Sequence, residues 1–162
     1  MSTLLHVVDA FTATPFSGNP AAVCRLPAPR SATWMQLVAR EMNLSETAFV
    51  HPIAGGWSLR WFTPTTEIAL CGHATLASAH ALCETGALPA NEPARFSNKS
   101  GWLTCRREGA WIEMDFPALQ VKAATVPAEL LAGLTITPSF VGFTGCRWLV
   151  EVSSEQMVRA AT

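Results

Sequence analysis

The chain has 162 residues, of which 49% are hydrophobic and 14% are charged, and its formal net charge is −1. This composition excludes a disordered chain, because a sequence with so many apolar residues collapses in water. Without a basic run longer than Arg106-Arg107 or an apolar stretch of roughly 18 residues, the sequence predicts neither a nucleic-acid partner nor a membrane span.

Cysteine usage bears on the cellular compartment. The five cysteines are odd in number and widely scattered, and the N-terminus reaches Asp9 without the basic start of a signal peptide. We therefore expect reduced thiols, no disulfide framework and a cytoplasmic location. The cysteines are Cys24, Cys71, Cys83, Cys105 and Cys146.

The first third of the chain alternates strand and helix signals. Trp57, Leu59 and Trp61 fall on one face of a strand, and Ser31 is a suitable N-cap for a helix that runs to about Met42. Glycine and proline mark the turns between these segments. The expected strands are residues 4–11, 21–26, 46–53 and 57–63, with the helix at 31–42.

A second helix is predicted from about His73 to Thr85, and Gly86 stands where its C-terminal stop belongs. Its side chains are small and apolar nearly all round, so other elements should enclose it. Strands at 94–97, 101–106 and 111–116 would wrap it, with a hairpin turn at Glu108-Gly109.

The C-terminal part has weaker signals. Residues 117–125 resemble a linker, residues 128–131 a short helix, and residues 139–143 and 147–152 a strand pair. Ser153 and Gln156 have the spacing of a capping box, which predicts the start of a last helix.

Cysteines and histidines cluster around the second helix. Cys71, His73, His80 and Cys83 form a Cys-x-His and His-x-x-Cys pattern that resembles zinc ligation. On one helix, however, His73 and His80 would lie about 10 Å apart along the axis, too far to share an ion. The sequence therefore predicts no metal site, and His80 and Cys83 are interpreted as packing positions.

The turn Cys71-Gly72-His73 stands at the mouth of that helix, where unpaired backbone N–H groups favour a carboxylate or an oxyanion. Gly72 would allow a ligand close to the backbone, and His73 could orient it or pass a proton. The plain alternative is an N-terminal turn with a hydrogen-bonded histidine.

Glu46 stands at the start of an otherwise apolar strand, a setting that suits a group that accepts and returns a proton. A solvent-exposed glutamate at a strand end is the alternative.

Glu67, Glu113 and Asp115 are interpreted as surface charges. No glycine-rich nucleotide motif and no Gly-x-Ser-x-Gly elbow occurs, so no nucleotide cofactor is indicated.

Three segments in order resemble the phenazine-biosynthesis (PhzF-like) isomerase family. They are Asp9-Ala-Phe-Thr-Ala-Thr-Pro-Phe-Ser-Gly-Asn-Pro-Ala-Ala-Val23, Glu41-Met-Asn-Leu-Ser-Glu-Thr-Ala-Phe49 and Leu59-Arg-Trp-Phe-Thr-Pro-Thr-Thr-Glu-Ile-Ala-Leu-Cys-Gly-His-Ala-Thr75. The resemblance is strong over residues 4–116 and looser beyond them. It implies an α+β fold like that of diaminopimelate epimerase, in which a curved, mostly antiparallel sheet wraps around a central helix.

The resemblance also implies a function. Family members move a proton between carbons of a small carboxylated substrate, without cofactor or metal. By this resemblance Glu46 is the catalytic acid/base group. Asn19, Ser45, Gly72 and His73 are substrate-binding residues, and Cys71 is an accessory residue at most. We expect Glu46 to face the amide-lined mouth of the second helix, close to His73, across a gap that a small acid can bridge.

The chain departs from the family in length, because family chains are nearly twice as long. We expect an N-terminal domain at 1–117 and a linker with the incomplete start of a second domain at 118–162. Half a cleft binds a substrate poorly, so weak or no activity is expected unless a homodimer supplies the missing wall. The alternative function is a non-catalytic remnant or binding module with the same fold.

Overall fold

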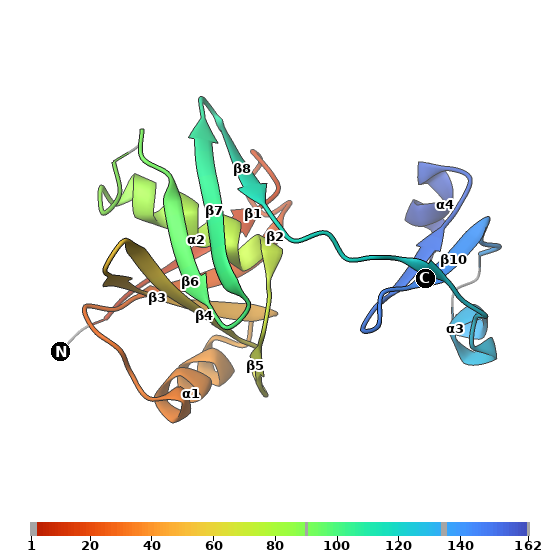
Figure 1. Cartoon of the computed structure of the whole chain (residues 1–162), viewed down its shortest axis with the longest axis horizontal. Coiled ribbons are helices and arrows are strands. Elements are labelled where there is room, and N and C mark those ends of the chain that lie inside the picture. The colour runs from red at the N-terminus through yellow and green to blue at the C-terminus, as the bar shows by residue number, and fades with distance from the viewer. Residues whose placement is uncertain (1–2, 90, 134–135, 162) are drawn as a thin grey trace. The chain divides into compact units, whose positions relative to one another are not determined.

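The computed structural model describes residues 3–89, 91–133 and 136–161. The chain divides into two compact units, Met1–Phe116 and Pro117–Thr162, which are described one at a time (Figure 1). Among the described residues, no helix has the length and apolar character needed to cross a membrane.

The first unit is built on an eight-stranded sheet in the order β1-β2-β3-β4-β6-β7-β8, with β5 paired to β4. Most neighbours are antiparallel, whereas β2 with β3 and β4 with β6 are parallel. Parallel neighbours need a crossover connection, and helices α1 (Ala32–Met42) and α2 (Gly72–Glu84) lie in these two. The strands are β1 (Leu4–Ala10), β2 (Asn19–Arg25), β3 (Glu46–Ile53), β4 (Gly56–Phe62), β5 (Glu67–Ile68), β6 (Ala94–Asn98), β7 (Gly101–Glu108) and β8 (Trp111–Asp115).

Alternation along β3 divides the core between the two faces of the sheet. Ala48 and Val50 belong to the larger apolar cluster, which contains α2, whereas Phe49 belongs to a second cluster with Met35 of α1. Figure 1 shows α2 within the curve of the sheet and α1 outside it. The predicted α+β architecture, a curved and mostly antiparallel sheet around a central helix, is confirmed.

Both helices begin and end close to the predicted residues. The Ser31 hydroxyl accepts a hydrogen bond from the Trp34 N–H at 3.2 Å and caps α1 as expected. Helix α2 begins at Gly72, one residue before the prediction, and Gly86 follows it with a left-handed φ of 66°. Eight of its residues are buried, so the prediction of an enclosed helix is also confirmed.

The second unit contains a three-stranded sheet in the order β11-β10-β9 and two short helices. The predicted linker at 117–125 is partly wrong, because residues 122–123 pair with β10. The predicted capping box at Ser153 is also wrong. Extended Ser154 caps the last helix by accepting from the Met157 N–H at 3.3 Å, while the Ser153 hydroxyl lies against the Met157 sulfur. The elements are β9 (Lys122–Ala123), α3 (Ala128–Gly133), β10 (Phe140–Phe143), β11 (Trp148–Glu151) and α4 (Glu155–Ala160).

Candidate active site

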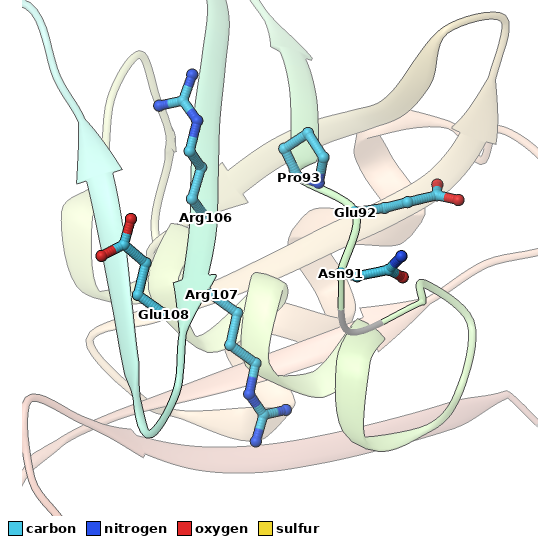
Figure 2. Close-up of a pocket in the computed structure, with 6 residues that line it drawn as sticks. All are labelled: Asn91, Glu92, Pro93, Arg106, Arg107 and Glu108. Atoms are coloured by element: carbon cyan, nitrogen blue, oxygen red, sulfur yellow. The ribbon is translucent and has the colours of Figure 1, made fainter.

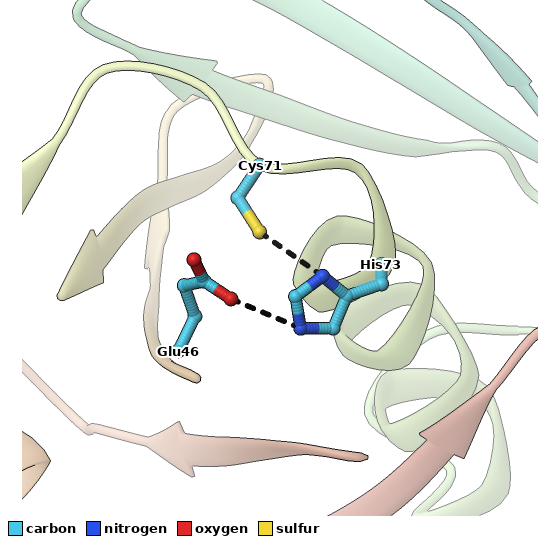
Figure 3. A group of neighbouring side chains, drawn as sticks. All are labelled: Glu46, Cys71 and His73. Carbon is cyan, nitrogen blue, oxygen red and sulfur yellow. Dashed lines mark hydrogen bonds and ion pairs between the residues drawn. The ribbon is translucent and has the colours of Figure 1, made fainter. Parts of the chain in front are cut away.

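A carboxylate, an imidazole and a thiol meet where β3 begins and α2 begins (Figure 3). The Nε2 atom of His73 lies 3.2 Å from the Glu46 Oε2 atom, and its Nδ1 atom lies 3.4 Å from the Cys71 sulfur. Glu46 is the first residue of β3, Cys71 is the N-cap residue of α2, and His73 is in the first turn of that helix. Glu46 thus joins two residues that lie 25 and 27 positions further along the sequence.

Local backbone rules direct Glu46 towards α2. Helix α1 ends at Asn43 in a left-handed conformation with φ of 50°, and the chain turns from there into β3. Because side chains alternate along a strand, Glu46 lies on the same face as Ala48 and Val50, which pack in the cluster that contains α2. The Glu46 side chain is 18% exposed to solvent, because it stands at the end of the strand.

The sequence led us to expect that Glu46 faces the helix mouth, close to His73, across a gap that a small acid could bridge. The two side chains do face each other, as expected, but they are in direct contact at 3.2 Å. A ligand therefore has to bind beside this pair or displace it. The contact forms because the first turn of α2 brings the imidazole up to the strand end, and the gap between Glu46 and the backbone N–H groups of the helix mouth stays a prediction.

Burial and charge act in opposite directions on His73. Burial lowers the pKa of its imidazole, and the nearby Glu46 carboxylate raises it. In the neutral ring, a proton on Nε2 can be donated to the Glu46 carboxylate, which leaves the Nδ1 lone pair towards the Cys71 thiol. The contacts thus favour one tautomer and align a thiol, an imidazole and a carboxylate.

The other predicted site residues lie around this cluster. The Ser45 hydroxyl is 3.3 Å from the same His73 Nε2 atom. A Cβ added at Gly72 would meet no atom within 4 Å other than those of its two chain neighbours and the backbone of its own helix, so open space adjoins the helix mouth. Exposed Asn19 begins β2, two residues before Ala21, which pairs with Glu46 in the parallel register. Asn19 therefore lies at the same end and on the same face of the sheet.

Glu67 is a residue whose setting the sequence interpretation missed. It was interpreted as a surface charge, but its side chain is only 16% exposed and accepts hydrogen bonds from Arg60 Nε at 2.7 Å and Nη2 at 2.9 Å. The Lys99 ammonium adds a contact at 2.6 Å. These hydrogen bonds lower the pKa of the Glu67 carboxyl to about 2, and the hydrogen bond from Arg60 has the largest effect. The surface interpretation of Glu67 is wrong.

This ion-pair group holds the segment that leads into the helix mouth. Ile68, next to Glu67, pairs with Trp61 of β4, and the Ser100 hydroxyl donates to the Ala69 carbonyl at 3.2 Å. Cys71 follows two residues later. The only sequence signal for this arrangement is the opposite charge of Arg60 and Glu67, which becomes informative once β4 and β5 are known to pair.

Three side chains of the cluster also satisfy the distances of a candidate metal group. One ligand atom each of Glu46, Cys71 and His73 lies within 4.8 Å of the other two. Within the described ranges this is the one such group, and it contains neither His80 nor Cys83. The four residues of the helix pattern therefore do not meet at one point, whereas Cys71 and His73 do so together with Glu46.

A surface hollow elsewhere in this unit has no connection with the cluster. It is lined by residues of β7 and of the segment before β6 (Figure 2). Arg107 there pairs with Glu84 at 3.0 Å. Glu84 is the last residue of α2, about 16 Å along the axis from His73. The hollow thus lies at the opposite end of the helix from the candidate active site.

Comparisons with known proteins identify the family of this chain. The family model described as phenazine biosynthesis-like protein matches residues 8–161. An uncharacterized isomerase of Halalkalibacterium halodurans is 56% identical over 160 residues, which cover 98% of this chain and 60% of that protein.

Two solved structures extend the comparison. A PhzF-family phenazine biosynthesis protein of Enterococcus faecalis has a TM-score of 0.89 at 36% identity, covering 100% of this chain and 62% of the other. A predicted epimerase of Pseudomonas aeruginosa has a TM-score of 0.74 at 22% identity, covering 99% and 62%, and so shows the shared fold alone. The chain belongs to the phenazine biosynthesis-like family and spans about three fifths of the length of these relatives.

Proposed function

We propose that this chain carries the acid/base side of an isomerase that moves a proton between carbons of a small carboxylated substrate. The observation that carries the proposal is the contact between Glu46 and His73 at 3.2 Å, beside open space at the first turn of an enclosed helix. Family membership and the isomerase name of a relative support the reaction class.

Each part of the cluster has a role in this proposal. The Glu46 carboxylate takes a proton from one carbon of the substrate and returns it to another. The first backbone N–H groups of α2 have no partner within the helix, so they and the helix dipole bind the substrate carboxylate next to Gly72. His73 donates from Nε2 and holds the Glu46 carboxylate in position, while Ser45 and Asn19 contribute polar contacts at the rim. No cofactor or metal enters this reaction.

The rest of the functional setting is proposed with it. Because the chain spans 60% of the isomerase relative, substrate-binding groups beyond those described here would complete the site in a full-length family member. We propose weak turnover for the 162-residue chain alone, a homodimer as the means of closing the site, and a cytoplasmic location.

Solvent deuterium exchange tests the proposal. The chain is incubated in deuterium oxide with a panel of small unsaturated carboxylic acids, and NMR follows incorporation at carbon. Exchange should occur with the unmodified chain and be lost in Glu46→Gln, while Glu113→Gln on exposed β8 serves as the matched control. Equal exchange in both variants would refute the role of Glu46. Binding of an acid without exchange in any form would favour the alternative of a non-catalytic binding module.

A further inference from the structure

We infer that Glu46, Cys71 and His73 form a zinc-binding site at the mouth of α2. Thiolate, imidazole and carboxylate are the three kinds of group that bind Zn²⁺ in proteins, and one ligand atom of each lies within 4.8 Å of the others. Three protein ligands with one open position is the pattern of zinc sites that keep an exchangeable water. Figure 3 shows the three side chains directed towards one another.

One edge of the coordination tetrahedron is already present. With zinc–sulfur and zinc–nitrogen bonds of about 2.3 and 2.1 Å, tetrahedral geometry separates the sulfur and nitrogen by about 3.6 Å. The Cys71 sulfur and the His73 Nδ1 atom lie 3.4 Å apart. Zinc would therefore take the place of the proton they share, with the thiol proton released to solvent as the sulfur–zinc bond forms.

The third ligand comes from a different element of the fold. The Glu46 carboxylate, whose ligand atom lies within 4.8 Å of the other two, has to move closer to complete a zinc-bound triangle, a movement that its partly exposed side chain permits. Its present bond to His73 Nε2 is given up in exchange for the metal bond. We infer that a water or a substrate carboxylate is the fourth ligand, since the open space next to Gly72 adjoins the two ligands Cys71 and His73 in the chain.

Of the cysteines among the described residues, Cys71 is the one that lies in the candidate metal group. Cys71 is 7% exposed and the His73 side chain 9%, so a bound ion is shielded from water on the protein side. Burial raises the pKa of the Cys24 and Cys105 thiols to about 11 and 12, which disfavours the thiolate that zinc needs. Exposed Cys146 lies near Thr144 in the second unit.

Zinc occupancy has a consequence for the reaction. A carboxylate bound to zinc cannot take a proton from carbon, so Zn²⁺ should inhibit the isomerase and compete with its substrate. This consequence rests on the proposed function, whereas the binding itself does not. It also revises the sequence prediction of no metal site, which weighed only the residues around one helix and not a ligand from β3.

Metal titration of the 162-residue chain tests the inference. Zn²⁺ binding is measured by calorimetry, and Co²⁺ is used as a coloured substitute whose sulfur-to-cobalt charge-transfer band reports a thiolate ligand. We expect one ion per chain and a charge-transfer band. Cys71→Ser should abolish that band, and Cys71→Ser and Glu46→Gln should each weaken Zn²⁺ binding at least about tenfold, since changes in groups that only support ligands already cost about 10–100-fold.

Two variants serve as matched controls. Cys83→Ser and Cys146→Ser remove other thiols and should leave both the stoichiometry and the band unchanged. Loss of the band in either control, or unchanged Zn²⁺ affinity in folded Cys71→Ser, would overturn the site. Circular dichroism of each variant establishes that it is folded.

The exchange assay separates this inference from the proposed function. Tight Zn²⁺ binding that suppresses deuterium exchange supports both. Absence of Zn²⁺ binding in a chain whose exchange depends on Glu46 overturns the zinc site alone. Site-specific Zn²⁺ binding in a chain that exchanges nothing supports the zinc site and contradicts the proposed function.

Discussion

Replacing Glu67 by glutamine should destabilise the first unit and loosen the segment that leads to the helix mouth. The ordinary pKa of a glutamate is about 4.3, and in the folded chain that of Glu67 is about 2. At about 1.4 kcal/mol for each unit of pKa, the difference corresponds to about 3 kcal/mol in favour of the folded state. Because Lys99 is 62% exposed and Arg60 28% exposed, water screens part of this, so we expect a loss of about 1–3 kcal/mol in Glu67→Gln.

The pH dependence of this stability has a definite sign. The folded-state pKa of Glu67 is lowered, so its contribution is fully present above about pH 4.3 and is lost as the pH falls towards 2. Urea unfolding measured between pH 7 and pH 3 should show this loss in the unmodified chain and a flatter dependence in Glu67→Gln. Glu155→Gln is the matched control, because its pair with Arg159 is exposed by more than three quarters on both sides and contributes little. Equal stabilities and equal pH dependences for the two variants would refute the reasoning.

Three further substitutions test other parts of the structure. Gly72→Ala should leave the free energy of unfolding unchanged or raise it by up to about 1 kcal/mol, because the added methyl group points into open space. The same substitution should weaken the binding of a carboxylated ligand in a calorimetric titration, and full ligand affinity would contradict a site there. Ser31→Ala should cost about 1 kcal/mol in urea unfolding through loss of the α1 cap, and Ser153→Ala, which removes no cap, is its control. Leu59→Ala should cost about 2–5 kcal/mol because the side chain is fully buried, and a loss below 1 kcal/mol would contradict the core described.

Local patterns in the sequence were sufficient for most of the elements. Period-two alternation identified β4 with Trp57, Leu59 and Trp61 inside, and the small apolar residues of α2 indicated an enclosed helix before any neighbour was known. Caps were found where a single serine was available, as at Ser31. Where two serines were adjacent, at Ser153 and Ser154, the spacing rule selected the wrong one because either could start the helix.

Glu67 shows where sequence interpretation failed. Its partner Arg60 is seven residues away, on the strand that pairs with β5, and Lys99 is 32 residues away. Neither distance follows a local period. Strand pairing decides which charges meet, so an acidic residue in a polar loop could not be distinguished from a surface charge.

Some properties of the candidate active site could likewise be predicted from the sequence, and others could not. The amino-acid sequence alone was sufficient to identify the family, the start of a helix at Cys71-Gly72-His73 and a carboxylate at the start of a strand. Motifs and hydrophobic periods can be recognised in consecutive residues, without knowledge of the tertiary structure. Only the tertiary structure decided that Glu46 contacts His73 directly, that the Cys71 sulfur lies against the other ring nitrogen, and that the space beside Gly72 is open. The physical reason is that the sheet register and the packing of α2 fix these distances, and both depend on contacts between residues far apart in the chain.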